Sequence, residues 1–277
     1  MPFDPTDAAE LIRIARHVAA TEVMPHFRAL DADRVATKAD AHDLVTPADT
    51  AAEAALTQAV RAAFPDALVV GEEAVAADPG VLDRLGQPGR VIVIDPIDGT
   101  WNYAVGQANF GLILAVVEDG ATVFGLHLDP AMDDWIMAHR GGGAFRVRGG
   151  TGHRLKTRAP AAMADWVGFL AMPLFEPEYR ARISATMPGF GRVLSWRCAA
   201  QEYRLVAEGH AAFFMNARLN PWDHAAGTLI VAEAGGHSAL IGGAPYTPRS
   251  RRGTLLTAAD RATWDRVAEV YSFLADR

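Results

Sequence analysis

The chain has 277 residues, half of them hydrophobic and 21% charged, and its 26 basic and 33 acidic residues give a formal net charge of −7. A chain this apolar can bury enough surface to offset its conformational entropy, which excludes an intrinsically disordered protein. The acidic balance disfavours a strong binder of nucleic acid or of anionic membranes, because both partners attract a basic excess.

The cysteine content and the N-terminal composition bear on where the protein works. Cys198 is the only cysteine, so no intramolecular disulfide can form. Residues 1–10 carry acids and prolines in place of the basic start and apolar run of a signal peptide. The longest apolar stretch, Phe110 to Val117, is far shorter than the roughly 20 residues that span a bilayer. These features predict a cytoplasmic protein with no membrane partner.

The first predicted elements are two helices and two buried strands. Apolar residues recur every three or four positions between Ala8 and Ala20, which predicts an amphipathic helix. A second helix is predicted from Thr46 to Phe64, because threonine can cap it and the following proline suits its first turn. Leu68–Val70 and Val91–Ile94 are β-branched runs typical of buried strands, and the second is predicted to stop at Asp95-Pro96.

The middle of the chain predicts an antiparallel meander. Phe110–Glu118 and Ala121–Leu128 are strand patterns joined by an Asp-Gly turn, which is typical of a hairpin. A second pair of predicted strands, Trp135–Ala138 and Ala144–Val147, flanks three consecutive glycines.

The Gly- and Arg-rich stretch 148–158 is predicted to connect two halves of one compact unit. Residues 1–148 form the N-terminal half with the antiparallel sheet, and residues 149–277 form a C-terminal α/β half. Helical patterns in the second half cover Ala199–Glu208, Asp223–Ala234 and Ala262–Leu274.

Carboxylates stand where the predicted elements begin or end. Glu72 follows the first predicted strand, Asp95 and Asp98 follow the second, and Asp223 lies at a helix start. If these anions converge on one cleft, they need protons or divalent cations between them. Oxygen ligands favour Mg²⁺ or Mn²⁺ over zinc. Asp95 and Asp98, with the Ile97 carbonyl between them, could bridge two ions about 3.5–4 Å apart, as in two-metal phosphoryl chemistry.

The Gly99-Thr100 step adds a candidate phosphate site. Glycine leaves room for close approach, and the residues after it can start a short helix whose N–H groups point at anions. Taken singly, the same residues also fit structural roles: Asp-Pro and Asp-Gly are turn dipeptides, Asp223 can cap its helix, and Thr46 with Asp49 fits a capping box.

Together these strings resemble the inositol monophosphatase-like family of metal-dependent, lithium-sensitive phosphatases. The matching segments are Lys38 with Asp43-Leu44-Val45-Thr46-Pro47-Ala48-Asp49, Gly71-Glu72-Glu73, Asp95-Pro96-Ile97-Asp98-Gly99-Thr100-Trp101-Asn102, Trp222-Asp223-His224-Ala225-Ala226-Gly227 and Glu233-Ala234-Gly235-Gly236. Their order and spacing cover most of the chain. The resemblance implies an α/β fold, the layered αβαβα sandwich of inositol monophosphatases and sugar phosphatases, which is usually paired as a homodimer.

The resemblance also implies the metal ligands. Glu72, Asp95 and the carbonyl of Ile97 would hold a first Mg²⁺. Asp95, Asp98 and Asp223 would hold a second. A third, weaker ion would lie near Glu72, and Mn²⁺ could substitute for Mg²⁺.

Catalytic roles follow from the same resemblance. Thr100 and Asp49 would form a hydrogen-bonded pair that, together with Glu72, orients and deprotonates a metal-activated water. Gly99 and Thr100 would donate backbone N–H bonds to the phosphate.

The substrate contacts depart from the family pattern. Inositol-selective members have a glutamate seven residues before the last metal-binding aspartate, and here that position is Asn216. Where the family usually shows Gly-Ser-Ala or Gly-Thr-Ala, this chain has Arg197-Cys198-Ala199. Arg197 would either favour a second anionic group or form a surface ion pair. Lys38 matches a family lysine near the metals or is a solvated surface residue. The candidate substrate contacts are Asp98, Ala199, Asn216, Arg197 and Lys38.

Three further residues next to these motifs are assigned structural roles. His224 is predicted to be a packed histidine, because it points away from Asp223 on their common helix. Cys198 is predicted to be a small core residue. Glu73 is predicted to support the site or to be exposed.

The expected function is Mg²⁺-dependent hydrolysis of a small phosphomonoester, an inositol or sugar monophosphate, by in-line attack of a metal-activated water. Trp101-Asn102 favours the inositol phosphatase branch over relatives acting on fructose bisphosphate, 3′-phosphoadenosine 5′-phosphate or histidinol phosphate, which stay alternatives. A regulatory binding protein on the same fold is another alternative, because some family members bind RNA polymerase or ribosomal RNA-associated complexes. A metal-dependent nuclease, or any nucleic-acid partner, is disfavoured by the lack of a clear basic groove in the sequence.

Overall fold

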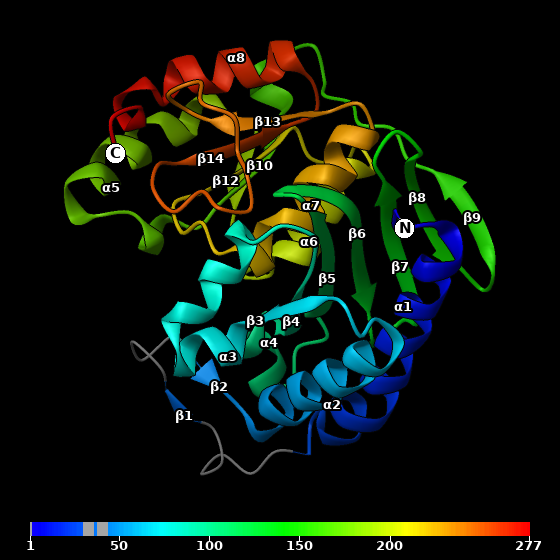
Figure 1. Ribbon diagram of the computed structural model, residues 1–277. Helices are drawn as coiled ribbons and strands as arrows, with labels where there is room; N and C mark the ends of the chain where they lie inside the picture. The colour runs from blue at the N-terminus through cyan, green and yellow to red at the C-terminus, as the bar shows by residue number, and fades with distance from the viewer. Residues whose placement is uncertain (1, 30–35, 38–43) are drawn as a thin grey trace.

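The computed structural model describes residues 2–29, 36–37 and 44–277. Its elements form alternating layers of helix and sheet, with two helices outside a seven-stranded sheet, two helices between the sheets, and two helices outside a five-stranded sheet (Figure 1). This is the αβαβα sandwich predicted from the sequence. Among the described residues, none of the helices is long and apolar enough to cross a bilayer.

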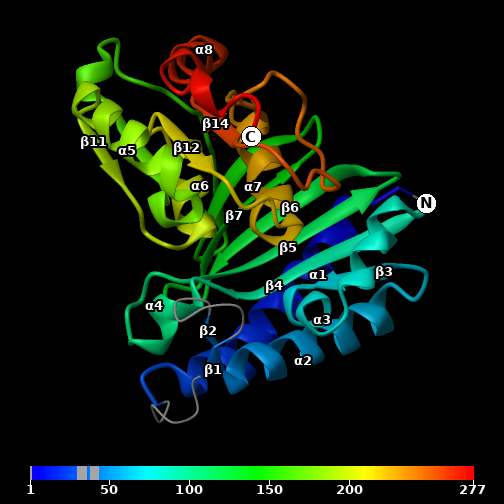
Figure 2. The same ribbon diagram turned by 90° about the vertical axis from the view of Figure 1, so that its left-hand side faces the viewer.

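The first layer consists of α1 (Pro5–Val18) and α2 (Pro47–Ala63), which cover one face of the larger sheet (Figure 2). Asp4 caps α1, and Thr46 closes a capping box with Asp49 at the start of α2. Both helices turn their apolar stripe inward, so the predicted helices are confirmed. A π-helical segment, Ala19–Val23, continues α1.

The seven-stranded sheet has the order β3-β4-β5-β6-β7-β8-β9. Only the β3–β4 pair is parallel, and the remaining pairs form the predicted antiparallel meander. The strands are β3 (Leu68–Gly71), β4 (Arg90–Asp98), β5 (Gly111–Glu118), β6 (Ala121–Asp129), β7 (Asp134–His139), β8 (Gly143–Arg148) and β9 (Thr151–Arg154).

Strand β9 corrects the expectation that 148–158 is only a connector. Gly149 and Gly150 both adopt positive φ values, 57° and 79°, which glycine tolerates best. The chain therefore reverses tightly after β8 and adds an exposed edge strand to the sheet. The division of the chain at residues 148 and 149 stays a prediction.

Strand β4 also departs from the prediction, because it runs through Asp95-Pro96 to Asp98. Asp95 pairs with Ile113 and Asp98 pairs with Gly111. Between these two pairs β4 advances by three residues while β5 advances by two. This extra residue is a β-bulge, and Pro96 is tolerated there because a bulge interrupts the ladder of hydrogen bonds. Residues three apart on a regular strand face opposite sides of the sheet. The bulge removes this alternation, so the side chains of both aspartates can face the same side.

The five-stranded sheet has the order β11-β10-β12-β14-β13, with β10 parallel to β11 and β12 and with β14 antiparallel to both neighbours. Its strands are β10 (Val167–Leu170), β11 (Arg192–Leu194), β12 (Phe213–Asn216), β13 (His237–Leu240) and β14 (Leu255–Ala258). The other elements are α3 (Glu72–Ala77), α4 (Thr100–Ala104), α5 (Pro177–Thr186), α6 (Ala199–Ala207), α7 (Pro221–Glu233), α8 (Arg261–Val270), β1 (Ala36–Thr37) and β2 (Leu44–Val45).

The last predicted helix, Ala262–Leu274, is corrected at its end. Helix α8 stops at Val270, and Ser272–Leu274 forms a separate 3₁₀ turn after Tyr271. Tyr271 leaves the helical region and is fully buried in a hydrophobic cluster that includes Leu256 of β14 and Trp264 of α8.

Helix α7 lies between the sheets and packs on β6 without an intervening side chain. A Cβ atom on Gly125 of β6 would lie 2.8 Å from the carbonyl oxygen of Ala226 and 2.9 Å from its Cα. Such distances are below van der Waals contact, so only glycine fits there. This close approach sets the position of α7, and with it Asp223, relative to the larger sheet.

Candidate active site

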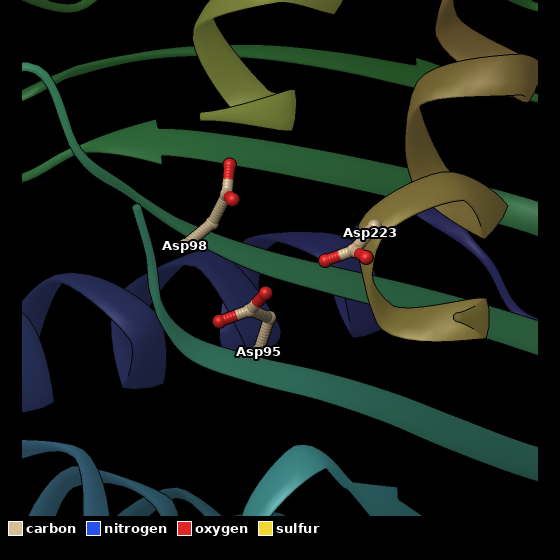
Figure 3. Close-up of side chains that lie close together, drawn as sticks. All are labelled: Asp95, Asp98 and Asp223. Carbon is tan, nitrogen blue, oxygen red and sulfur yellow. The ribbon is translucent and has the colours of Figure 1, made fainter. Parts of the chain in front are cut away.

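Three aspartates from two elements come together in one cleft (Figure 3). Asp95 and Asp98 come from the bulge of β4, and Asp223 lies in the first turn of α7. One carboxylate oxygen of each lies within 4.8 Å of the others. Asp95 is 1% exposed and Asp98 is 8% exposed. The structure thus brings together the three aspartates singled out in the sequence.

The crowding of these carboxylates changes their acidity. Burial raises the pKa of Asp95 well above its usual range, and the neighbouring charges of Glu72, Asp98 and Asp223 raise it further. Burial also raises the pKa of Asp223, with Asp98 and Glu72 adding to the effect. Without a cation, these carboxyl groups therefore keep their protons to a higher pH than separate, exposed carboxyl groups would.

The cluster fits a divalent cation. Asp95 Oδ1 is buried and accepts no hydrogen bond within the described part of the chain. A buried acceptor without a partner costs about 1–3 kcal/mol, which a cation would offset. Glu72 and Ile97 line the same cleft as the three aspartates, so all five ligands implied by the family resemblance face it. An all-oxygen donor set of this kind suits Mg²⁺ or Mn²⁺.

Asp98 is held by the start of α6. Ala200 N–H donates to Asp98 Oδ2 at 2.5 Å, and the Cys198 thiol donates to the same oxygen at 3.2 Å. Both bonds lower the pKa of Asp98 against the raising effect of burial. Cys198 is buried, as predicted, but this polar contact is not evident from the sequence. Burial raises the pKa of the thiol, so it stays protonated and can donate.

Asp49 joins α2 to α4 through its two oxygens. Its Oδ2 accepts the N–H and the hydroxyl of Thr46, at 2.8 and 2.6 Å. Its Oδ1 lies 3.2 Å from Thr100 Oγ1, which also reaches the Ile97 carbonyl at 3.0 Å. The capping box and the Thr100–Asp49 pair are therefore both present, because each uses a different oxygen.

Glu53 supports the site and was missed in the sequence. It is buried, and its carboxylate accepts the N–H groups of Glu73 and Ala74 at 2.7 and 2.8 Å. These bonds fix the first turn of α3, where Glu72 begins the helix. Glu53 follows Asp49 by one helical turn on α2. Residues spaced by one turn lie on the same face of a helix, so this spacing could have predicted that Glu53 lies on the same side of α2 as Asp49.

Glu202 is a second carboxylate that sequence reasoning missed. It is buried, lines the cleft and accepts the Trp196 N–H at 2.6 Å. Burial raises its pKa to about 8, and the charge of Asp98 contributes. In the sequence, Glu202 is an ordinary polar residue within a predicted helix. Nothing in the neighbouring residues indicates that it is buried.

The cleft has a volume of about 830 Å³. Asp98, Ala199, Asn216 and Arg197 line it, as the candidate substrate contacts require. Asn216 Oδ1 accepts the N–H of Arg218 at 2.8 Å. Lys38, the remaining candidate, lies outside the described residues.

Histidine 224 is packed and does not line the cleft. His224 Nδ1 lies 3.0 Å from the hydroxyl of Tyr203, and its Nε2 lies 2.8 Å from the Arg218 carbonyl. Burial lowers its pKa to about 4, so the ring is neutral near pH 7. This arrangement agrees with the predicted structural role. Glu73 is half-buried, and its backbone N–H donates to the Glu53 carboxylate.

The model of the inositol monophosphatase family matches residues 6–272. The chain belongs to this family. Membership confirms the predicted resemblance and makes the protein a phosphoric monoester hydrolase by family. Among inositol monophosphatase relatives, a "fructose-1,6-bisphosphatase/inositol-1-monophosphatase" of Thermotoga maritima is 33% identical over 205 residues, which are 74% of each chain. The "inositol-1-monophosphatase" of Bacillus subtilis is 32% identical over 77% of this chain and 78% of its own. The "Nus factor SuhB" of Escherichia coli is 32% identical over 81% of each chain.

Solved structures of inositol monophosphatases share the fold. A Thermotoga maritima inositol monophosphatase superposes with a TM-score of 0.79 at 29% identity, covering 96% of each chain. Inositol monophosphatase II of Staphylococcus aureus superposes with a TM-score of 0.78 at 26% identity, covering 97% of this chain and 93% of its own.

Proposed function

We propose that the protein hydrolyses an inositol or sugar monophosphate and uses Mg²⁺ to do so. The observation that carries this proposal is the convergence of Asp95, Asp98 and Asp223 beside the Asp49–Thr100 pair in one cleft. The relatives named as inositol-1-monophosphatases support the substrate class.

The proposed metal ligands are oxygen donors that line the cleft. Glu72, Asp95 and the Ile97 carbonyl would hold one ion, and Asp95, Asp98 and Asp223 a second, with room for a third near Glu72. When bound, Mg²⁺ lowers the pKa of the attacking water and neutralises charge on the attacking and leaving oxygens. Mn²⁺, which takes the same oxygen donors, would substitute.

The Thr100 hydroxyl and the Asp49 carboxylate would accept the proton that the attacking water loses. Thr100 Oγ1 donates toward Asp49 Oδ1, which leaves a lone pair of the hydroxyl to accept a hydrogen bond from water. A proton can then pass from the water through Thr100 to the carboxylate of Asp49. The Thr46 bonds to Oδ2 hold this carboxylate in place, and Glu72 orients the water from the other strand end.

The turn after β4 would bind the phosphate. Gly99 has a φ of 87°, and a Cβ there would lie 3.2 Å from the carbonyls of Arg197 and Asn109. Glycine is therefore required, and we propose that the N–H groups of Gly99 and Thr100 donate to the phosphate. Asp98, Ala199 and Asn216 would contact the rest of the substrate, with the Asn216 amide bonding a hydroxyl without adding charge.

The test is phosphate release by the purified protein from inositol 1-phosphate, sugar monophosphates, histidinol phosphate and 3′-phosphoadenosine 5′-phosphate. Each reaction is run with Mg²⁺ and with excess chelator. We expect chelator-sensitive turnover that is highest for inositol or sugar phosphates. Silence across the panel, or a preference for the nucleotide, would overturn the proposal.

We further propose that the protein acts in the cytoplasm as a homodimer. The family resemblance supports the dimer, and light scattering on the purified protein with and without Mg²⁺ tests it. A mass of one chain, near 29.6 kDa, at micromolar concentration would contradict it.

A further inference from the structure

A second pocket lies at the β9 edge of the larger sheet, and its charge is opposite in sign to that of the whole chain. It has a volume of about 520 Å³. Four basic side chains line it against one carboxylate: Arg146, Arg154, Lys156 and Arg158 against Glu208. Arginine and lysine side chains each carry one positive charge at neutral pH, so the pocket has a net charge of +3. The whole chain carries −7.

This pocket is separate from the carboxylate cluster. None of the described residues that line it also lines the cleft of Asp95, Asp98 and Asp223. Four strands lie between β9 and β4, which carries two of those aspartates (Figure 1). At about 4.8 Å per strand, β4 and β9 are roughly 24 Å apart. The pocket contains none of the proposed metal ligands, so an anion held there would not be hydrolysed.

Three of the four cations lie at alternate positions of a segment that continues from β9. Arg154, Lys156 and Arg158 are exposed, whereas Leu155 and Thr157 between them are buried. Alternate residues of an extended chain face the same side, so the three cationic side chains project together at intervals of about 6–7 Å. The N–H groups of both buried residues donate to carbonyls of β8 and of the end of α7, at 2.8 and 3.0 Å. The fold therefore anchors this row of cations.

The end of α6 forms the opposite side of the pocket. Glu208 follows this helix, and its carboxylate lies 3.5 Å from Arg146 Nη1 and 3.8 Å from His210 Nε2. Arg158 Nε donates to the Gly209 carbonyl at 3.2 Å. Both contacts hold the two guanidinium groups at the pocket. The single carboxylate is directed at Arg146 and leaves the row of cations uncompensated.

Arg154 and Lys156 are the cations with unused charge. Within the part of the chain that the structure describes, neither side chain forms an ion pair or a hydrogen bond. Positive charges held this close together repel one another, and a bound anion would reverse the sign of that interaction. The arrangement is therefore suited to an anionic ligand.

We propose that this pocket binds a small anion that carries two phosphate groups. Each phosphate group carries about −1.5 to −2 charges at pH 7, so two of them match the local charge of +3. Guanidinium groups such as Arg154 bind phosphate through two parallel N–H···O bonds, and the Lys156 ammonium adds a point charge. The pocket volume lies in the range of about 300–1,000 Å³ that is usual for small ligands. A long polyanion is disfavoured because the rest of the acidic molecule would repel it.

The test is isothermal titration calorimetry of inorganic pyrophosphate into protein that has been stripped of metal and dialysed free of chelator. Metal removal takes away the cations that would hold a phosphate at the carboxylate cluster. We expect one site per chain with a Kd below about 100 µM at low salt, and at least about tenfold weaker binding of inorganic phosphate. Phosphate binding as tight as that of pyrophosphate overturns the proposal, and so does the absence of pyrophosphate binding at about 1 mM.

Two further probes identify the source of the paired phosphates. Tighter binding of ADP than of pyrophosphate assigns a nucleoside diphosphate, and equal or weaker binding assigns a free diphosphate. Binding of a single-stranded RNA oligonucleotide without binding of either small probe overturns the small ligand.

The variant combines Arg154→Gln with Lys156→Gln. Both side chains are exposed, so the fold should change in stability by less than about 0.5 kcal/mol per site. The Kd for pyrophosphate should rise at least about tenfold. An unchanged Kd would show that pyrophosphate binds elsewhere and overturn the site.

The matched control combines Arg192→Gln with Arg252→Gln. Both arginines are exposed and lie outside the pocket, so this variant removes the same charge elsewhere. Its Kd should change by less than about twofold, because distant exposed charges are screened. An equal loss in both variants would show a general charge effect and overturn the site. Binding is measured without substrate or metal, so this inference stands or fails independently of the proposed hydrolysis.

Discussion

Asp95 is the one side chain shared by both proposed ion sites. It is also the most deeply buried carboxylate of the cluster, and one of its oxygens lacks a partner among the described residues. No other residue of the cluster combines these features, so the chemistry should depend on it more steeply than the fold does.

Asp95→Asn should therefore lower kcat by at least about 10³-fold at saturating Mg²⁺. The amide has nearly the same shape and removes repulsion with Glu72, Asp98 and Asp223. We thus expect unfolding in chelator to need at least as much urea as the parent chain. Activity within a few-fold of the parent would contradict the proposed ligand set.

Glu202 predicts a particular pH dependence of stability. Burial raises its pKa to about 8 in the folded protein, from a usual value near 4.5. Between these pH values the folded state keeps a proton that the unfolded chain releases, so the free energy of unfolding falls as pH rises. Glu202→Gln should make this slope shallower by up to about 1.4 kcal/mol per pH unit. Urea unfolding in chelator from pH 5 to 8 measures it.

Glu178→Gln, at an exposed position of α5, is the control for that series and should follow the parent chain. Parallel slopes for the parent chain and Glu202→Gln would contradict a buried, protonated Glu202.

Elements with a strong local pattern were predictable from the sequence. The stripe of α1, the Thr46-Pro47 start of α2 and the Asp-Gly hairpin between β5 and β6 each carry their own signal. The bulge of β4 and the edge strand β9 do not, because both are defined by the register of a neighbouring strand. The same distinction applies to the site.

Short contiguous strings located Asp95, Asp98 and Asp223, whereas Glu53 and Glu202 owe their roles to distant partners. In the sequence, Glu53 is one more polar residue of a helix. Its role depends on α3, whose first N–H groups donate to its carboxylate in the folded protein. Arg180 reaches the cleft from a helix that had no sequence prediction at all, since α5 lacks a clear apolar stripe. Tertiary contacts of this kind leave no periodic trace in the sequence.

The contact of β6 with α7 gives a prediction at the scale of elements. Gly125→Ala places a methyl group against the backbone of Ala226, which cannot rotate away. We expect a loss of about 1–3 kcal/mol in the free energy of unfolding. Gly152→Ala on β9, where the nearest atom is 4.0 Å from the added carbon, should change it by less than about 0.5 kcal/mol. Urea unfolding compares them, and equal effects would contradict the close packing.

At the scale of the whole molecule, the proposed ligands come from three separated segments. Glu72 starts α3, the two aspartates of β4 follow, and Asp223 starts α7 more than a hundred residues later. Ions that bind all three segments bind only the folded state. Ligand binding and global stability should therefore be linked.

Mg²⁺ at about 100 times its dissociation constant should add about 2.7 kcal/mol to the free energy of unfolding. For a chain of this size that corresponds to a rise in Tm of roughly 5 °C or more. Calorimetry with Mg²⁺ and with chelator measures the shift. Asp95→Asn should show a much smaller rise, and the same rise in both proteins would contradict metal binding at this cluster.

The cleft also separates two kinds of residue by their place in the molecule. The aspartates of β4 are buried at a bulge, and Asp98 is also bound by the start of α6, whereas Arg180, Arg197 and Arg218 are exposed residues of the cleft lining. Substitution of an exposed side chain changes stability little, while substitution within the buried set disturbs packing and charge together. Descendants of this gene can therefore exchange these exposed lining residues, and so acquire new substrates, while the hydrolytic centre is inherited intact.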